Sequence, residues 1–391
     1  MSKTKLTDIL DQISFSDTTQ REGRQSEGAH LTPQVSIDHA RLVNLLGIDY
    51  LELNHPASSP VLGQLVKDIF KLKLKTKIAT HVRCNLRDIQ TAINAGTNCI
   101  NTYIPINPES KKDIKNSIQI AKNDLTLIAP KLSQRNIELR VSVEHTLSLP
   151  LPLLCQIYRQ VTAISCVKRV GLAETTGVCF PCRLKKYAAA IYQVIPTNVP
   201  IQFHLHNDHG LVAANFLEIL GLLVQNGRQA VFDISVAGFG ERNGILSYGD
   251  VFSILYLINK DKLKSRYQIK HYAKLVTLIE KTIGVPLCRR DPLNPWAFSH
   301  SAGPHVDGMI NGHNPYQAIT PADFGFKLKL NVGHCVTGYR GLQAYAKTEL
   351  KQDLSDNLAK QIAADVRQRA SLDGPLNTHQ LSKLILNFPH Q

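Results

Sequence analysis

Short apolar segments alternate regularly with amphipathic ones along most of this chain, and this alternation restricts its fold more than any other feature. The apolar segments have the length and residue preference of β-strands, and they lie at residues 13–17, 49–53, 76–82, 98–104, 137–143, 166–172, 200–206 and 229–236. A segment with helical character follows each of them. Eight strand–helix pairs within about 250 residues predict an α/β fold, a TIM (β/α)8 barrel. A doubly wound open sheet is the alternative, but it more often carries a glycine-rich phosphate loop after its first strand, and residues 17–24 do not form one.

The alternation stops after about residue 267. Beyond it, the sequence predicts a helix near residues 272–283, a loop-rich segment at 291–326, and two helices that begin near Ser355 and at Asn377 or Thr378. We therefore expect a catalytic barrel at residues 1–270, followed by a linker and a small, mainly helical C-terminal domain at residues 271–391.

The charge balance is basic, with a formal net charge of +14 among 391 residues. The basic residues are spread along the chain without an aromatic-interleaved basic motif, so we predict no nucleic-acid partner. Attraction for a small anionic ligand explains the charge as well. No apolar run is long enough to span a bilayer, so we expect no membrane partner. The N-terminus carries charges where a signal peptide needs an apolar segment, which predicts a cytoplasmic protein.

The eight cysteines are scattered singly, apart from the pair Cys179 and Cys182. A Cys-x-x-Cys pair can hold zinc or act in redox chemistry. A second pair is missing here, however, and Gly177 and Pro181 mark a loop. Free thiols in a reducing compartment are therefore the favoured interpretation.

Polar side chains collect where the predicted strands end, which is where TIM barrels carry their active sites. The residues concerned are Arg21, Glu22, His81, Arg140, Ser142, Glu144, Thr175, His204 and His206, together with the segment 238–244 after the eighth strand. They come from stretches that are far apart in the sequence. The predicted barrel would bring them all to one mouth.

Two histidines at the end of the seventh strand predict a metal site. Side chains two residues apart on a strand point the same way, so His204 and His206 share one face and Leu205 lies on the other. Two imidazoles and a carboxylate from elsewhere make a good site for a divalent metal ion. Zinc, manganese, iron, cobalt and magnesium all remain open. The alternative is a pair of core histidines held by hydrogen bonds.

Three motifs in this order resemble the metal-dependent, Claisen-condensing TIM-barrel synthases, a family that includes homocitrate, 2-isopropylmalate and citramalate synthases. The motifs are residues 17–23 (DTTQREG), 204–208 (HLHND) and 238–244 (GFGERNG). The similarity covers almost the whole chain and extends to residues 297–305 (AFSHSAGPH). Within the family, homocitrate synthases are most similar, on the basis of residues 52–58, 80–84 and 140–144.

The resemblance implies an acyltransferase of lysine biosynthesis. It would condense acetyl-CoA with a 2-oxo acid, here 2-oxoglutarate, and hydrolyse the thioester to give homocitrate and CoA. By resemblance, Glu22, His204 and His206 hold a divalent metal ion that polarises the carbonyl of the oxo acid. The alternative for Glu22 is a surface ion pair with Arg21. Arg21 would bind substrate and stabilise the oxyanion, and its alternative role is to hold Glu241.

The same resemblance assigns the rest of the site. Arg140 would pair with the distal carboxylate of the oxo acid, and His81, Ser142 and Thr175 would complete the substrate pocket. For these last three, core packing and ordinary strand polarity are the alternatives.

Deprotonation of acetyl-CoA needs a base, and the family supplies a His and a Tyr from the linker of the neighbouring subunit. His305 and Tyr316 match them, with plain loop packing as the alternative, and Glu144 is a further acid/base candidate. The resemblance thus predicts a homodimer whose linker residues complete the neighbouring site.

The sequence departs from the family pattern at four places: Gln20, His145, Glu174 and the segment 105–110. Condensation with another 2-oxo acid, to a 2-isopropylmalate or citramalate type of product, is the alternative reaction. A metal-dependent CoA-thioester lyase is less favoured, because such relatives carry a cysteine in the glycine-rich loop after strand eight and residues 238–244 have none. A 2-oxoglutarate-dependent iron oxygenase normally uses an all-β scaffold, and the intact motifs oppose an inactive binding protein.

Overall fold

The structure is a computed structural model that describes residues 5–106, 109–284, 286–287, 289–310, 312 and 316–389, apart from the side chain of Lys111. The chain forms two compact units, Met1–Leu293 and Asn294–Gln391. Helix α10 (Tyr272–Ile283) lies in the first unit, whereas the predicted boundary at residues 270 and 271 gave this helix to the C-terminal part. The division into functional domains stays a prediction.

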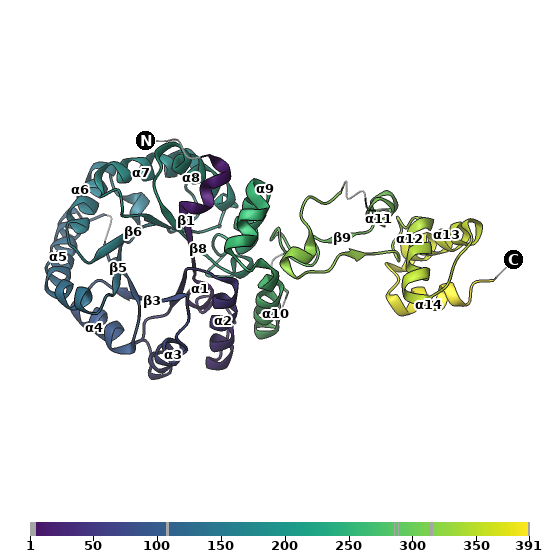
Figure 1. Ribbon diagram of the computed structural model, residues 1–391, viewed down its shortest axis with the longest axis horizontal. Helices are drawn as coiled ribbons and strands as arrows, with labels where there is room; N and C mark the ends of the chain where they lie inside the picture. The colour runs from purple at the N-terminus through teal and green to yellow at the C-terminus, as the bar shows by residue number, and fades with distance from the viewer. Residues whose placement is uncertain are drawn as a thin grey trace. The chain divides into compact units, whose positions relative to one another are not determined.

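Eight parallel strands close into a barrel in sequence order, with β8 paired to β1 (Figure 1). The strands are β1 (Ile13–Asp17), β2 (Tyr50–Leu53), β3 (Lys77–Arg83), β4 (Cys99–Ile104), β5 (Glu138–Val143), β6 (Val167–Glu174), β7 (Ile201–Leu205) and β8 (Ala230–Ile234). Parallel neighbours need a crossover between them, and helices supply it here. The TIM-barrel prediction is therefore confirmed.

Helices surround the barrel on its outer side (Figure 1). They are α2 (Pro33–Leu46), α3 (Pro60–Lys71), α4 (Leu86–Ala95), α5 (Lys111–Gln134), α6 (Leu151–Thr162), α7 (Pro181–Val194), α8 (Val212–Asn226) and α9 (Tyr248–Arg266), and α10 packs against α2. Their starts follow local rules. Thr32, for example, caps α2 by accepting a hydrogen bond from the Val35 backbone N–H at 3.2 Å, and Pro33 occupies the first helical position.

Two segments near the site differ from the sequence prediction. The residues after β1 contain a short helix, α1 (Thr19–Gly23), that the sequence did not predict. Strand β7 ends at Leu205, one residue before the predicted end, because His206 forms an isolated antiparallel bridge with Ile245 instead. This bridge ties the end of β7 to the loop after β8.

The interior of the barrel is unusually polar. Such interiors are commonly filled by branched apolar residues, but Glu52, Asn101, Arg140, Gln202 and Asp233 are all buried here. Because buried polar groups are costly without partners, they bind one another: the Asn101 amide donates to Glu52 at 2.8 Å, and the Gln202 amide donates to Asp233 at 2.6 Å. A polar network thus forms the floor of the barrel mouth.

The second unit has its own small core. It contains a two-stranded pair, β9 (Ser299–His300) and β10 (Lys329–Leu330), and the helices α11 (Gly303–Ile310), α12 (Tyr339–Tyr345), α13 (Asp356–Asp373) and α14 (Thr378–Leu386). Leu342, Ile362, Val366 and Leu381 are among the buried residues of this core. Ser355 caps α13, and Asn377 forms a capping box with Gln380 at the start of α14, which confirms both predicted helix starts.

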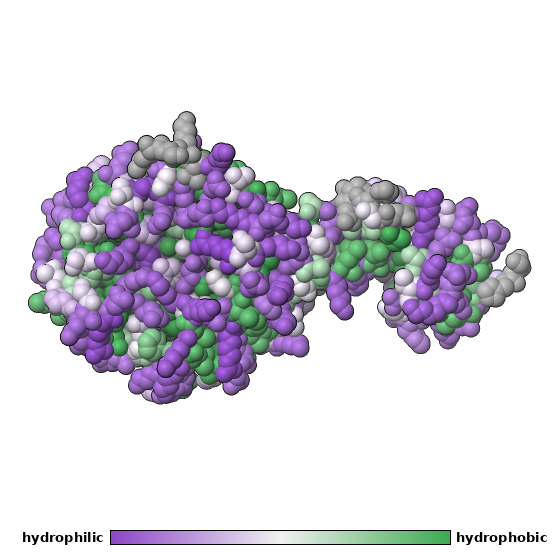
Figure 2. All heavy atoms as spheres, in the orientation of Figure 1, coloured by the Kyte–Doolittle hydropathy of each residue, from purple (hydrophilic) through white to green (hydrophobic). Residues whose placement is uncertain are grey.

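The surface is mixed in character. Figure 2 shows hydrophilic side chains over most of the visible face of the first unit, with apolar ones interspersed among them. Within the described part of the chain, no helix has both the length and the apolar character that a membrane crossing requires.

Candidate active site

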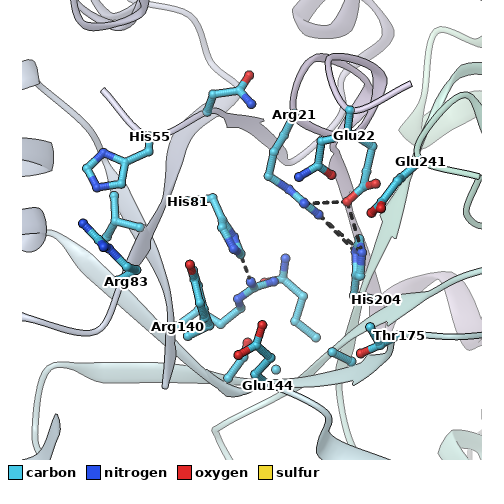
Figure 3. Close-up of a pocket in the computed structure, with 18 of the residues that line it drawn as sticks. Arg21, Glu22, His55, His81, Arg83, Arg140, Glu144, Thr175, His204 and Glu241 are labelled. Carbon is cyan, nitrogen blue, oxygen red and sulfur yellow. Dashed lines mark hydrogen bonds and ion pairs between the residues drawn. The ribbon is translucent and has the colours of Figure 1, made fainter. Parts of the chain in front are cut away.

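A cavity of about 600 Å³ opens at the C-terminal ends of the barrel strands, and every strand or the loop after it contributes to its lining (Figure 3). Its walls include all nine barrel residues that the sequence singled out: Arg21, Glu22, His81, Arg140, Ser142, Glu144, Thr175, His204 and His206. Parallel strands all end at the same rim, so residues from distant stretches meet there. The roles of these residues stay predictions, but their convergence is a property of the fold.

Glu22, His204 and His206 form a group that could hold a metal ion, because each offers one ligand atom within 4.8 Å of the other two. It is the one such group of at least three His, Cys, Asp or Glu side chains among the described residues. Cys179 is buried and Cys182 is exposed, and neither joins such a group. The three residues fit a divalent metal ion. Glu22 Oε2 and His206 Nδ1 are buried atoms with no hydrogen-bond partner among the described residues, and a bound cation would satisfy them.

His204 is held between two carboxylates. Its Nδ1 lies 3.1 Å from Asp233 Oδ2, and its Nε2 lies 3.3 Å from Glu22 Oε1. Burial alone lowers the pKa of His204, but the hydrogen bonds to Asp233 and Glu22 outweigh burial and raise the pKa to about 9. A carboxylate on the far nitrogen of a metal-binding histidine fixes the ring and its tautomer. Asp233 therefore orients Nε2 toward Glu22.

His206 has the opposite electrostatic character. Burial, and then the positive charge of His204, lower the pKa of His206 to about 4. The ring is therefore neutral at physiological pH, and metal ions bind neutral imidazole. The two rings meet nearly edge to face, with centroids 5.1 Å apart.

Arg21 joins two carboxylates, Glu22 beside it in α1 and Glu52 on β2. Its Nη1 lies 2.5 Å from Glu22 Oε1, and its Nε lies 2.7 Å from Glu52 Oε1. The pair with Glu22 that the sequence suggested is thus present, but it is buried rather than on the surface. Arg21 does not hold Glu241, which lies 3.4 Å from Arg242 instead. Although burial disfavours its charge, these carboxylates raise the pKa of Arg21 further, so it stays a fixed cation.

The loop at residues 238–244 packs directly on the candidate metal group. A Cβ at Gly240 would lie 3.1 Å from Glu22 Cβ, so glycine permits this close approach. Arg242 fastens the loop, because its guanidinium bonds the Asp208 carboxylate at 2.8 and 3.1 Å and the Thr175 carbonyl at 2.6 Å. The motif segments after β6, β7 and β8 are thereby held together.

Arg140 and His81 lie deeper in the cavity than its rim. Arg140 is 3% exposed, and its Nη1 lies 3.3 Å from Asp233 Oδ2. Its Nε is buried without a hydrogen-bond partner among the described residues. Burial lowers the pKa of His81 despite Glu52, whose Oε1 lies 2.9 Å from His81 Nδ1. A buried cation that lines the cavity beside a neutral imidazole suits a carboxylate of a ligand.

Glu52 and Asp233 are two central residues that the site prediction missed. Glu52 contacts Arg21 and His81, and Asp233 contacts His204, Arg140 and Gln202. Their sequence signal was a carboxylate inside an otherwise apolar strand segment, in DYLEL and in QAVFDISV. Acidic residues are rarely fully buried unless they are paired, so each marked a partner on another strand. Which partner it was depended on the closed barrel.

Gln20, Glu174 and His145, three of the departures from the family pattern, do not line the cavity. The amide nitrogen of Gln20 donates to the Ser36 carbonyl at 2.8 Å and lies 3.2 Å from His39 Nδ1, whereas its Oε1 is buried without a hydrogen-bond partner among the described residues. Glu174 is buried and accepts a hydrogen bond from the Val178 backbone N–H at 3.2 Å in the loop after β6. His145 does not line the cavity. Within the altered segment 105–110, residues 107 and 108 lie outside the described residues.

His305 and Tyr316 belong to the second unit, where the structure brings them together. Their rings stack with centroids 4.0 Å apart and planes inclined by 19°. Both side chains are exposed, with Tyr316 44% exposed. An imidazole against a phenol ring is a plausible acid/base pair in geometry, but their role at the barrel site stays a prediction.

Comparisons with known proteins agree with this arrangement. The model of the HMGL-like family matches residues 12–279, and a model described as homocitrate synthase post-HMGL domain-like matches residues 294–373. The cytosolic homocitrate synthase isozyme of Saccharomyces cerevisiae is 29% identical over 375 residues, which cover 95% of this chain and 85% of the relative. A homocitrate synthase of Saccharolobus islandicus is 26% identical, with 92% and 77% covered.

A solved structure supports the fold. Hydroxymethylglutaryl-CoA lyase from Pseudomonas aeruginosa aligns with a TM-score of 0.58 and 19% sequence identity, over 72% of this chain and 95% of that chain. At this identity the likeness concerns the barrel fold alone.

Proposed function

The chain belongs to the HMGL-like family, and from this premise we propose that it is an acyltransferase that condenses acetyl-CoA with 2-oxoglutarate to give homocitrate and CoA. One observation carries the proposal: a single cavity joins the candidate metal group to the buried Arg140. A dicarboxylic 2-oxo acid needs both features, one at its oxo-carboxylate end and one at its distal carboxylate. The homocitrate synthases among the relatives, and the domain model matched by the second unit, support the same reaction.

Glu22, His204 and His206 would hold the divalent metal ion, which when bound supplies Lewis-acid polarisation of the oxo-acid carbonyl. The buried charges suit this arrangement. Three cationic groups face three carboxylates, namely Arg21, Arg140 and protonated His204 against Glu22, Glu52 and Asp233. A dication held in place of the His204 proton would give the floor of the cavity an excess positive charge. An anionic oxo acid would balance that charge.

Arg140, His81 and Ser142 would select the oxo acid. The guanidinium of Arg140, which lines the cavity, can pair with a distal carboxylate. Because burial keeps His81 neutral, its ring adds a hydrogen bond without a second charge. The branched apolar tail of 2-oxoisovalerate would lie against these polar groups without a charge or a hydrogen bond to offer them, which costs binding energy. These residues therefore favour 2-oxoglutarate over monocarboxylic acceptors.

The carbon–carbon bond forms when acetyl-CoA loses a methyl proton and the resulting enolate carbon attacks the carbonyl carbon of the oxo acid. Glu144 lines the cavity and is the base candidate from the barrel, while His305 and Tyr316 are the candidates from the second unit. Arg21 remains cationic and would stabilise the oxyanion that develops on the former carbonyl oxygen. Water then cleaves the thioester and releases the CoA thiol.

A thiol-release assay tests the reaction. Purified, metal-loaded protein is given acetyl-CoA with 2-oxoglutarate, 2-oxoisovalerate, pyruvate or oxaloacetate in turn. We expect preference for 2-oxoglutarate, loss of activity in His206→Ala, and retention in His209→Ala, an exposed histidine in the same loop. Preference for 2-oxoisovalerate would keep the chemistry but refute the role of Arg140. Absence of thiol release with every acceptor would refute the condensation.

We also propose that the protein is a homodimer in which His305 and Tyr316 complete the neighbouring site. Subunit mixing tests this directly. His206→Ala and His305→Ala are each expected to be inactive, but dimers that exchange subunits would contain one site with neither change. Mixed and re-equilibrated samples should recover up to about a quarter of the wild-type activity per site, from the statistics of random two-fold pairing. A fully active monomer, or no recovery after verified exchange, would contradict the shared site.

The alternative enzyme is a synthase of the same chemistry with another 2-oxo acid, which the acceptor panel distinguishes. A CoA-thioester lyase is disfavoured because residues 238–244 contain no cysteine. We also propose a cytoplasmic location. The Saccharomyces cerevisiae relatives do not decide this point, because they include both a cytosolic and a mitochondrial homocitrate synthase.

A further inference from the structure

One flank of the cavity has no task in the scheme above. Asn54, His55 and Ser58 from the loop after β2, together with Arg83 at the end of β3 and Tyr103 on β4, line the cavity there. Figure 3 shows His55 and Arg83 across the pocket from Glu22 and His204. Neither the candidate metal nor the oxo acid needs these residues. The cavity therefore extends beyond the space that the oxo acid would occupy.

Arg83 is the cationic group on this flank, and it is held in one orientation. It lies two residues after His81 on β3, so both side chains point toward the mouth. Its Nε donates to Asp88 Oδ2 at 2.7 Å, and its Nη2 lies 3.5 Å from Asp88 Oδ1. The side chain is nevertheless 59% exposed. The guanidinium thus turns one edge to Asp88 and leaves the Nη1 edge for other partners.

Asp88 is a rigid anchor for Arg83. Its side chain is 4% exposed, and its backbone N–H donates to Asn85, the N-cap of α4, at 2.9 Å. Burial alone raises the pKa of Asp88, but hydrogen bonds from Arg83, His55 and Asn85 outweigh burial and lower the pKa, so the carboxylate stays ionised. An exposed ion pair by itself adds little to stability. A buried partner instead fixes the direction of the exposed guanidinium.

His55 supports this anchor rather than acting as a base. Its Nδ1 accepts a hydrogen bond from the Ala57 backbone N–H at 2.9 Å, and its Nε2 lies 3.0 Å from Asp88 Oδ2. With both ring nitrogens engaged, no lone pair is left to take a proton from a substrate. His55 therefore positions Asp88, which in turn positions Arg83.

We propose that Arg83 binds a phosphate group of acetyl-CoA at the rim of the cavity. This inference rests on the proposed condensation and names the contact for its second substrate. A guanidinium edge presents paired donors that match phosphate oxygens, and acetyl-CoA is the one substrate of the proposed reaction that carries phosphates. The degree of exposure separates the two arginines: Arg140 is buried where a carboxylate would enter, whereas Arg83 stays in solvent, where the charged nucleotide end of CoA would remain.

The test compares two acyl donors that differ in their phosphates. For Arg83→Gln, the KM for acetyl-CoA should rise on the order of tenfold, as for loss of one charge-assisted hydrogen bond. The KM for acetyl-pantetheine, which lacks phosphates, and the KM for the oxo acid should stay within about twofold. Arg87→Gln is the matched control, because Arg87 is exposed on α4 and does not line the cavity. Arg83→Lys should recover part of the affinity.

A rise of equal size for acetyl-CoA and acetyl-pantetheine, or no difference between Arg83→Gln and Arg87→Gln, would overturn the proposal. Calorimetric titration with CoA and with pantetheine makes the test independent of turnover. If no acceptor supports thiol release, weaker CoA binding in Arg83→Gln alone would still support the phosphate contact while the condensation fails. If the Gln variant does not fold, the same comparison with Arg83→Lys applies, and unchanged CoA affinity there would count against bidentate phosphate binding.

Discussion

Metal binding should release about one proton per site at pH 7.5, and the reason is the pair of unlike histidines. With a pKa of about 9, His204 is almost fully protonated at that pH in the metal-free protein. His206, with a pKa of about 4, is neutral. A metal ion must displace the proton from His204 but none from His206. Two histidines with the ordinary pKa of about 6.5 would together release only about 0.2 proton under the same conditions.

Replacement of Asp233 by Asn perturbs this balance with almost no change in shape. The hydrogen bond to Asp233 is the largest contribution that raises the pKa of His204, so Asp233→Asn should lower that pKa and with it the number of protons released on metal binding. The metal affinity should fall by about 10- to 100-fold, as expected when the group that orients a ligand histidine is lost. The amide also cannot satisfy every neighbour, because Gln202 donates to one carboxylate oxygen and Arg140 and His204 lie at the other.

Isothermal titration with Zn²⁺ in two buffers of different ionisation enthalpy counts the released protons. His206→Ala serves as a control that should still release about one proton if it binds the metal, since His204 is unchanged. His204→Gln should release almost none. If the wild-type protein releases no more than about 0.2 proton at pH 7.5, or if Asp233→Asn releases as much as wild type, the electrostatic account of the site is wrong.

Three further outcomes follow from the same contacts. Arg140→Met should raise the KM for 2-oxoglutarate by about 10- to 100-fold and spare a monocarboxylic 2-oxo acid; steady-state kinetics on both acids check this, and equal losses would contradict it. The unfolding free energy of the metal-free protein should fall by up to about 3 kcal/mol between pH 6.5 and 9. Protonated His204 stabilises the folded state fully below pH 6.5, and this contribution is lost above pH 9 or so because its folded-state pKa is about 9. Urea unfolding at several pH values measures this, and in His204→Gln the unfolding free energy should depend less on pH. Gly171→Ala would place a Cβ 1.9 Å from Ser142 Oγ, so displacement of that hydroxyl should raise the KM for the oxo acid about tenfold. Gly221→Ala is the control, because a Cβ there meets open space. An unchanged KM in Gly171→Ala would show that Ser142 does not contact the oxo acid.

Local sequence patterns were sufficient for the elements of the barrel. Ser355 and Asn377 were recognisable as helix starts because a cap depends on residues within one helical turn. The end of β7 was misplaced by one residue, since the His206–Ile245 bridge joins segments that are far apart in the sequence. The short helix α1 was also missed, because five residues give too little periodicity to recognise.

For the candidate site too, part could be predicted from local sequence and part depended on tertiary contacts. Each of the nine barrel residues could be placed at the mouth from its position at a strand end, but Glu52 and Asp233 could not be assigned partners. Glu52 meets Arg21 from α1 and His81 from β3, and Asp233 on β8 meets Arg140 on β5. Strands β5 and β8 are not neighbours in the sheet, so Arg140 and Asp233 touch only when the barrel closes around them. Sequence spacing carries no information about that contact.

By itself, the sequence determined the strand–helix order, and with it the edge at which the polar residues gather, because these depend on local periodicity and on short connections. Only the tertiary structure decided which of those residues carry a proton. His204 and His206 are two residues apart, yet one gains two carboxylate partners and the other gains a positive neighbour. In a buried, weakly screened interior, the charge of each group is set by distances of a few ångströms across the barrel, and only the folded chain fixes those distances.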